Sequence, residues 1–312
     1  GLLMASPWIL GLLAFVAAPM VLSLLLSLSR WSGLTTLAEA RFVGLANYAE
    51  AFTNDARFTA SLAATALYAA LAVPAGQAAA LGAALLMIRR LPGVHFFRAV
   101  WYLPTVLAGV AMAVLWWWVF DTDYGLMNAA LAPAAAALDA VCDALFGPPP
   151  ETWGARWFAP PAWFGEDAHA YGVPAFAITS LWTIGGAMLI YIAGLAAIPA
   201  HLYEAARLDG AGPLRRFWNV TVPMLSPVIL FNLIIAIIAS FQIFTQAFVM
   251  TRGGPGDATL FYVLYVYFEA FESHNMGYAS ALAWLLLLVI LALTAAVLRL
   301  SRRSVHYDGG RP

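Results

Sequence analysis

Long apolar runs separated by short polar segments dominate the hydrophobic pattern of this chain. A transmembrane helix needs about 20 consecutive apolar residues, and six stretches reach that length without an acidic or basic residue. We expect membrane-spanning helices at residues 8–29, 60–88, 99–120, 174–196, 224–250 and 276–298. The pattern therefore predicts an all-α polytopic membrane protein with six transmembrane helices, in which residues 1–312 form a single transmembrane domain.

One further stretch, residues 126–146, admits two interpretations. It is rich in alanine and long enough to cross a membrane, but it contains a proline and two aspartates, Asp139 and Asp143. An aspartate at the centre of a span costs about 2.5–3.5 kcal/mol on the insertion scale, and alanine offsets little of that cost. A seventh span would also move the charged segment at 199–223 across the membrane. We therefore expect an amphipathic helix on the outer side, within a long outer loop at residues 121–172.

The second half of this outer loop is rich in aromatic side chains, namely Trp153, Trp157, Phe158, Trp163 and Phe164. Tryptophan gathers at membrane–water interfaces, where its ring is partly in lipid and its N–H is in water. Aromatic side chains are also enriched where proteins dock on one another. The aromatic residues are therefore either a membrane interface belt or a docking surface for a partner.

Composition supports the membrane assignment and excludes several classes of function. The chain is 63% hydrophobic and 10% charged, whereas soluble domains are about 45–50% apolar and about 25% charged. A formal net charge of −1 gives no basis for binding nucleic acid. The chain has no lysine, which the phosphate-binding loop of ATPases requires. We therefore expect no cofactor on this chain and, in any ATP-driven role, ATP and Mg on partner subunits.

The sequence offers no catalytic constellation and no metal site. Cys142 is the single cysteine, and the five histidines are scattered along the chain without the spacing of metal ligands. The serines within the spans lack a neighbouring histidine–acid pair. We therefore expect a protein that is not an enzyme.

The distribution of arginine predicts the orientation of the chain. If the N-terminus is cytoplasmic, ten of the fifteen arginines lie in segments on the inside and five on the outside. Loops on the cytoplasmic side carry an excess of basic residues. We therefore expect N-in and C-in topology.

The segment at 199–223 is charged yet lies between two apolar spans, so it must reach water at one face of the bilayer. Good helix formers surround Glu204, Ala205 and Ala206, and Gly210 is expected to force a bend. A second short helical piece then leads to Pro223 and the fifth span. The pattern predicts a bent helical elbow at the cytoplasmic surface, called the elbow below.

The elbow resembles a signature of the membrane subunits of bacterial ABC importers: E-A-A, three residues, G, nine residues, then I-x-L-P. Glu204, Ala205, Ala206, Gly210 and Pro223 fall on that spacing, with valines in place of the isoleucine and leucine. The form EAARLDGAG, which includes Asp209, is similar to the maltose and glycerol-phosphate branch of the family. The resemblance implies that these six residues belong to a coupling loop that docks into a cleft of an ATPase subunit.

The resemblance extends along nearly the whole chain. Residues 42–48 (FVGLANY), 251–255 (TRGGP) and 277–281 (GYASA) are similar to family segments near the first, fifth and last spans. The family implies a second, related permease subunit, two ATPase subunits and an extracytoplasmic solute-binding protein, around a path for a sugar, oligosaccharide or polyol. The resemblance also implies that such a subunit lies, surrounded by membrane lipid, in a bacterial or archaeal plasma membrane, which is the inner membrane where two are present. The long outer loop departs from the family pattern.

Polar residues within the spans are candidates for that path, because unpaired polar groups are costly in lipid. The fifth span carries Asn232, Ser240, Gln242, Thr245 and Gln246. In a continuous helix, the last two and Gln242 would share one face. Trp182 and Thr183 of the fourth span are weaker candidates. The alternative is that these groups bridge neighbouring helices, and both interpretations remain open.

Three rival functions compete with the carbohydrate path. A glycerol-phosphate permease of the same family is the nearest, although the spans lack basic residues, which favours a neutral solute. An ion-coupled secondary transporter would normally place a charged residue within a span, and the six spans have none. A membrane-embedded enzyme would need an acid, a histidine pair or a metal set there.

Overall fold

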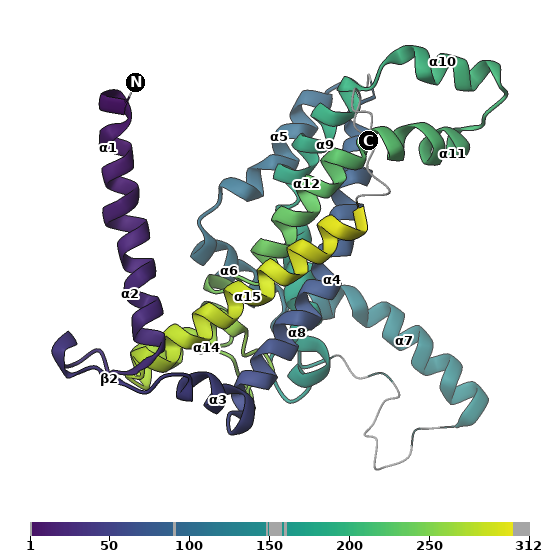
Figure 1. Ribbon diagram of the computed structural model, residues 1–312. Coiled ribbons are helices and arrows are strands. Elements are labelled where there is room, and N and C mark those ends of the chain that lie inside the picture. The colour runs from purple at the N-terminus through teal and green to yellow at the C-terminus, as the bar shows by residue number, and fades with distance from the viewer. Residues whose placement is uncertain (1, 90–91, 148, 150–157, 159–160, 302–312) are drawn as a thin grey trace.

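The structure, a computed structural model, describes residues 2–89, 92–147, 149, 158 and 161–301. Regular structure in this part is almost entirely helical, which confirms the all-α class (Figure 1). Long helices contact one another lengthwise and form a bundle, while shorter elements gather at its two ends.

Three of the expected spans are helices of membrane-crossing length. They are α1 (Leu2–Leu12) continued by a π turn (Leu13–Ala17) and α2 (Ala18–Ser27), α4 (Ala56–Met87), and α15 (Met276–Ser301). Asp55 begins α4, since its carboxylate accepts the backbone N–H groups of Arg57 and Phe58. This N-cap satisfies two donors that have no partner within the helix.

The third and fourth expected spans are bent. The third consists of α5 (Val94–Tyr102) and a 3₁₀ turn (Leu103–Val106), followed by α6 (Gly109–Val119). The fourth consists of α8 (Ala168–Ser180) and a 3₁₀ turn (Leu181–Thr183), followed by α9 (Gly185–Ala197). The bends are 100° and 50°. At the first bend, Leu107 and Ala108 are extended, with ψ of 141° and 132°. A straight helix over residues 99–120, which the apolar run alone indicates, is therefore not what forms.

The fifth apolar segment begins in the elbow and is interrupted near its end. The elements are α10 (Ala200–Leu208), α11 (Pro213–Arg216), a π turn (Phe217–Thr221), α12 (Val222–Ser240) and α13 (Thr245–Met250). Residues 241–244 between the last two are not helical. The interruption lies within the segment expected to cross the membrane.

Short elements gather at the end of the bundle opposite the elbow. They are β1 (Ser29–Arg30), which pairs antiparallel with β2 (Arg41–Phe42), a 3₁₀ turn (Leu37–Glu39), α3 (Ala46–Thr53), α7 (Leu126–Phe146), and α14 (Tyr262–Tyr267) with a π turn (Phe268–Glu272). Asn47 ties this region to the first span by donating to the carbonyls of Ser27 and Ser29 at 2.8 and 3.0 Å.

The N-terminal end of α1, the elbow and the C-terminal end of α15 lie at one end of the molecule, called the elbow end below (Figure 1). The strands, α3 and the start of α4 lie at the other, called the outer end. The N-in and C-in orientation stays a prediction.

Helix α7 stands away from the bundle (Figure 1). Its 21 residues pass a test of length and hydropathy for a membrane helix, with none of the tested window buried. By the same test, the described chain holds five such helices, or up to seven if each bent pair counts as one span. The six-span count and the outer-side position of α7 therefore stay predictions.

The described residues form two buried clusters along the bundle. The outer core is aromatic and includes Phe120, Phe176 and Phe261. The elbow core is made of smaller side chains on α4, α9 and α12 and includes Ala84 and Met188. Small side chains let helix backbones approach closely in a membrane. The two clusters meet near the middle of α4, which is where the candidate site lies.

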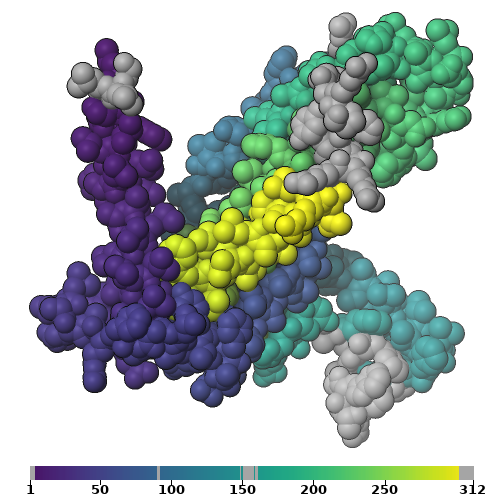
Figure 2. All heavy atoms as spheres, in the orientation of Figure 1, coloured from purple at the N-terminus to yellow at the C-terminus, as the bar shows by residue number. Residues whose placement is uncertain are grey.

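The first span touches the bundle at its base and stands free above it (Figure 2). The contact is between α2 and the start of α15. Gly277 is required there, since a Cβ at this position would lie 2.1 Å from the carbonyl oxygen of Ser29. Many large apolar side chains of the first span are exposed, among them Trp8, Phe15 and Leu25, so this helix presents apolar surface to lipid or to another subunit.

Candidate functional site

A cavity of about 360 Å³ lies between α4, the α8–α9 bend and the interrupted fifth segment. Its polar lining residues are Tyr68, Gln77, Ser180, Thr183, Ser240, Gln242 and Gln246. None of the described residues that line it is charged. Hydroxyl and amide groups can both donate and accept hydrogen bonds, so the cavity suits a neutral, polyhydroxylated solute. We call it the solute cavity.

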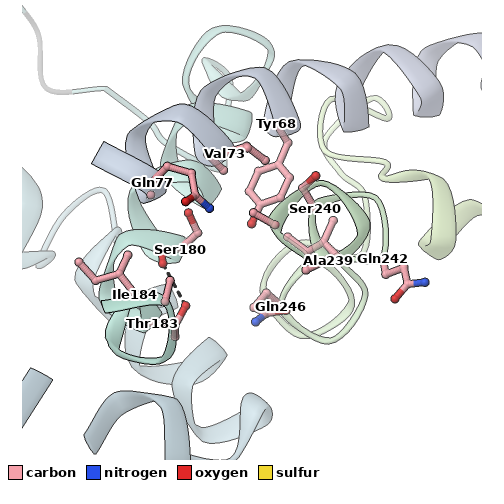
Figure 3. Close-up of a pocket in the computed structure, with 15 residues that line it drawn as sticks. Tyr68, Val73, Gln77, Ser180, Thr183, Ile184, Ala239, Ser240, Gln242 and Gln246 are labelled. Carbon is pink, nitrogen blue, oxygen red and sulfur yellow. Dashed lines mark hydrogen bonds between the residues drawn. The ribbon is translucent and has the colours of Figure 1, made fainter. Parts of the chain in front are cut away.

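Side chains from three elements converge on the solute cavity (Figure 3). Tyr68 and Gln77 come from α4 and face Ser180 across the gap, while Ser240 and Gln246 border it from the fifth segment. Gln242 is exposed and points away from the space between Tyr68 and Gln77. Of the sequence candidates, Ser240, Gln246 and Thr183 therefore face the cavity most directly, and Gln242 lies at its rim.

The helix break at 241–244 creates the fifth-segment wall of the cavity. The face shared by Gln242, Thr245 and Gln246 in a continuous helix does not exist, because Phe244 leaves the helical region with φ of −136°. The Ser240 hydroxyl donates to the carbonyl of Ile237 at 2.8 Å, a local bond that competes with regular helix geometry. Irregular backbone at membrane depth is tolerated where it lines a cavity.

A polar network closes the cavity toward the elbow end. The hydroxyl of Tyr191 donates to the Gln77 Oε1, and the Gln77 Nε2 donates to the carbonyl oxygen of Asn232 at 3.1 Å. The Asn232 Nδ2 lies 3.5 Å from the carbonyl oxygen of Ala187. Asn232 is buried and outside the cavity lining. In this conformation Asn232 bridges helices.

Two other sequence candidates lie beside the cavity rather than in its lining. The methyl group of Thr245 packs against Gly109 of α6. The Trp182 ring meets Trp116 edge-on, with ring centroids 5.7 Å apart. Both side chains fix neighbouring helices against the cavity wall.

Tyr68, Gln77 and Ser180 were missed by the sequence analysis. Gln77 carried a usable signal, because it is the single amide in the apolar run 60–88. Tyr68 and Ser180 carried none, since isolated tyrosine and serine residues are common in apolar helices. Their role depends on helix contacts that the sequence does not state.

The outer core closes the other end of the solute cavity. The Tyr68 ring packs edge-on against Phe261 with centroids 5.5 Å apart, and Phe261 packs against Phe176 at 5.1 Å. Trp163 is 6% exposed and donates its Nε1–H to the Oδ1 of Asn128 at 2.7 Å. Trp163 therefore belongs neither to a membrane interface belt nor to a docking surface for a partner, and both predictions are wrong for this residue. Phe158 is exposed, while Trp153 and Trp157 lie outside the described residues.

The elbow is two short helices joined at Gly210. This residue has φ of +73°, and a Cβ added to it would meet no atom within 4 Å, so its conformation rather than space selects glycine. The N–H of Ala211 donates to the carbonyl of Ala206 at 2.9 Å and ends α10. The turn expected at Gly210 is thus where the two helices change direction, and Pro223 lies in the first turn of α12.

The elbow carries an open cavity and exposed apolar side chains. Ala205, Ala206 and Asp209 line a cavity of about 320 Å³ between α10 and α11, and Glu204 is exposed beside it. Leu208 and Leu214 are 90% and 71% exposed. Exposed apolar side chains rimmed by polar groups are typical of protein interaction sites.

Within the described part of the chain, no group of three or more His, Cys, Asp or Glu residues is arranged to hold a metal ion. The polar groups of the site are instead single hydroxyls and amides spread over several helices. The arrangement can bind and position a solute.

Comparison with known proteins shows what this chain is similar to. Residues 72–306 match the family described as "Binding-protein-dependent transport system inner membrane component". The chain is 34% identical over 306 residues to the probable ABC transporter permease protein YesP of Bacillus subtilis (strain 168), covering 97% of this chain and 90% of YesP. It is 33% identical over 296 residues to the sulfoquinovosyl glycerol transport system permease protein SmoG of Agrobacterium fabrum (strain C58 / ATCC 33970), covering 93% and 85% respectively.

A solved structure shares the fold. It is the crystal structure of a bacterial alginate ABC transporter in complex with alginate pentasaccharide-bound periplasmic protein. One of its chains matches with a TM-score of 0.73 and 17% identity, covering 96% of this chain and 93% of that chain.

Proposed function

Because this chain belongs to the family of binding-protein-dependent transport system inner membrane components, we propose that it forms the path of an ATP-driven importer for a sugar, oligosaccharide or polyol. It is an ABC transporter permease, a transport subunit rather than an enzyme. The observation that carries the proposed solute class is the solute cavity, whose polar lining is uncharged. The relative SmoG supports it, since its name places it in a sulfoquinovosyl glycerol transport system.

The assembly that we propose contains a second related permease, two ATPase subunits and a solute-binding protein. The family description names the dependence on a binding protein. Although α2 contacts α15, many large apolar side chains of α1 and α2 are exposed. This exposed apolar surface supports a second membrane subunit. The absence of lysine from the chain supports ATP hydrolysis on separate subunits, which bind ATP and Mg.

The elbow is the proposed coupling element. Its exposed Leu208 and Leu214 and the small residues Ala205 and Ala206 would allow close docking in a cleft of the ATPase. Closure of the ATPase dimer would then move α10 and α11, and with them α12, which forms one wall of the solute cavity. Such a rigid connection gives the coupling a physical carrier.

The orientation that we propose is N-in and C-in, with α7 on the outer side. Cys142, in α7, is the single cysteine and is partly exposed. A membrane-impermeant thiol reagent should label it in right-side-out cells. A second variant, Cys142→Ser with Ala136→Cys, moves the thiol to an exposed position of the same helix. If neither thiol reacts in intact cells while both react after lysis, the proposed orientation is wrong.

The path is tested by uptake through the assembled transporter. Ser240→Ala and Gln246→Ala each remove one hydrogen-bonding group from the solute cavity, worth about 0.5–1.5 kcal/mol when neutral. We expect uptake at subsaturating solute to fall about two- to tenfold, with assembly and basal ATP hydrolysis retained. Ser226→Ala is the matched control, because Ser226 also bonds the carbonyl three residues before it on α12 but does not line the cavity. Normal uptake in both cavity variants would contradict the proposed path.

A further inference from the structure

A second pocket lies at the elbow end of the bundle, on the side of the elbow that meets the membrane helices. It has a volume of about 420 Å³ and is bounded by the ends of α4 and α9, by α10 and by the start of the fifth segment. Its lining includes Leu85, Arg89, Tyr203, Arg216, Phe217 and Thr221. We call it the basal pocket. The proposed function uses neither its charge nor its hydroxyl groups.

The basal pocket is basic and its charges are unpaired. Arg89 and Arg216 line it, and none of its described lining residues is acidic. Neither arginine forms an ion pair with any part of the chain that the structure describes. The Nε of Arg216 is buried and has no hydrogen-bond partner there. A buried charged donor without an acceptor is costly, so this arrangement favours an anionic ligand that supplies one.

A third arginine adds positive charge at the same helix end. The Nη2 of Arg98, on α5, donates to the carbonyl oxygen of Met87 at 2.7 Å, beside the last residues of α4. Its Nε is also buried without a partner among the described residues. The end of α4 is thus surrounded by guanidinium groups, two of which have an unused N–H.

Hydroxyl groups complete the polar part of the pocket. The Tyr203 hydroxyl and the Thr221 Oγ1 lie 3.0 Å apart. One of the two donates to the other, and the second keeps its proton for a ligand. Two arginines and one hydroxyl suit the oxygens of a phosphate, because guanidinium binds phosphate through paired N–H groups.

The rest of the wall is apolar. Leu85 and Phe217 line the pocket together with other aliphatic side chains, and α4 reaches the limit of its apolar run at this level. A soluble phosphate would gain nothing from that wall, whereas an acyl chain or glycerol backbone would cover it. Basic pockets between membrane helices on the cytoplasmic side are typical binding sites for anionic lipid headgroups.

The basal pocket borders the part of the elbow proposed to dock with the ATPase, because Arg216 also lines the elbow cavity together with Ala205 and Ala206. Arg216 is the last residue of α11 and is followed by the π turn that leads into α12, whereas Leu208 and Leu214 flank the turn at Gly210. Arg89, Tyr203 and Thr221 line the basal pocket and not the elbow cavity, so the two pockets are separate although Arg216 borders both.

We propose that the basal pocket binds the phosphate headgroup of an anionic phospholipid, with Arg89 and Arg216 on the phosphate and the apolar wall against the lipid body. The bound lipid joins the root of the elbow to the end of α4. Assignment to the cytoplasmic leaflet rests on the proposed orientation, but the chemistry of the pocket does not.

The test measures lipid retained by the assembled transporter. The complex is placed in nanodiscs of phosphatidylcholine with added phosphatidylglycerol, extracted in mild detergent, and examined by native mass spectrometry. Arg89→Gln and Arg216→Gln should each reduce retained phosphatidylglycerol about fivefold, the effect of one basic group near an anionic surface. Arg299→Gln is the matched control, because Arg299 also lies at the elbow end, in the last turn of α15, but not in the pocket. Its retention should equal that of the wild type.

Three outcomes would overturn the proposal. One is equal retention in Arg89→Gln, Arg216→Gln and the wild type. Another is displacement of the lipid by millimolar inorganic phosphate or glycerol phosphate, which would assign the pocket to a soluble anion. The third is loss of the ATPase subunits from Arg216→Gln with lipid retention unchanged, which would assign the arginine to a protein interface. Arg216→Lys, which keeps the charge but not the paired N–H groups, should retain an intermediate amount of lipid.

Discussion

Among the described residues, the outer half of this permease leaves one buried polar group without a partner, the Nε1 of Trp116, whereas the elbow half leaves two buried guanidinium groups with an unused N–H. At the outer end, Asp55 receives hydrogen bonds from the hydroxyls of Tyr265, at 2.5 Å, and Tyr278 while it caps α4. Deeper in the bundle, the Thr65 Oγ1 accepts the N–H of Tyr262 at 2.8 Å. These bonds join α4 to α14 and α15.

The elbow half is held by small side chains and one polar network. Gln77, Tyr191 and Asn232 connect α4, α9 and α12. Beyond this network, Arg98 and Arg216 carry buried N–H groups without partners in the described chain, and the elbow exposes leucines to solvent. The difference indicates that the outer half is held mainly by contacts within the chain and that the elbow half is completed by other molecules.

The largest expected effect is on the stability of the outer half. Asp55→Ala removes a helix cap and the shared acceptor of two tyrosines, and hydrogen bonds to a charged group are worth about 1.5–3 kcal/mol each. We expect a loss of about 3 kcal/mol or more, seen as a lower unfolding temperature of the purified complex. Asp257→Asn is the matched control, since its ion pair with Arg57 is largely exposed and such pairs are worth about 0–1 kcal/mol. Equal destabilisation by both variants would remove the distinction between the two halves.

A second prediction concerns the elbow, where function should change without a change in stability. Gly210→Val opposes a positive φ and should weaken retention of the ATPase and uptake, while the permease still inserts and accepts the binding protein. Gly210→Asn is the control, because asparagine tolerates the left-handed region and no atom lies close enough to obstruct its side chain. Pull-down of the ATPase with each variant measures the effect. Retention and uptake that are normal in Gly210→Val would show that the bend is not needed for coupling.

The smallest expected effect is a pH dependence at the outer end. Burial, and secondarily the charge of Asp55, raise the pKa of Glu269 above its ordinary value of 4.5. The folded protein therefore holds this proton more tightly than the unfolded chain, and stability falls as pH rises from the ordinary pKa through the raised one. Glu269→Gln should remove this decline.

Unfolding temperatures across a pH series test that sign. The curves of Glu269→Gln and the wild type should converge below the ordinary value of 4.5, because Glu269 is then neutral in both states. They should separate as pH rises, with the variant more stable. A variant that is less stable at neutral pH would show that the ionised carboxylate is favoured in the folded protein.

The hydropathy pattern and the spaced signature were sufficient for the fold class and the family. Long uncharged apolar runs can fold only as membrane helices or buried helices, since backbone groups in lipid must bond within their own segment. The turn at Gly210 was also predictable, because a glycine followed by Gly212-Pro213 between helix formers leaves few conformations. These properties are local, so they can be read from neighbouring residues.

The composition of the solute cavity was only partly predictable. Ser240 and Gln246 were found as polar residues in an apolar run, but Tyr68 and Ser180 were not, and Asn232 proved to bridge helices. Nothing in the residues around 241–244 requires the break that shapes one wall, since this stretch contains neither glycine nor proline. Which side of a helix meets a cavity depends on how several helices pack, and that packing involves residues more than a hundred positions apart.

By itself, the sequence determined that the chain is a membrane permease with a bent charged elbow, because length, hydropathy and turn chemistry act over short distances. The tertiary structure alone decided where the third and fourth spans bend, which polar groups face the solute cavity, and that Trp163 is a core residue. It also decided that Arg89 and Arg216, far apart in sequence, share one pocket. Each of these features is a contact between distant segments, and its energy exists only once the helices are packed.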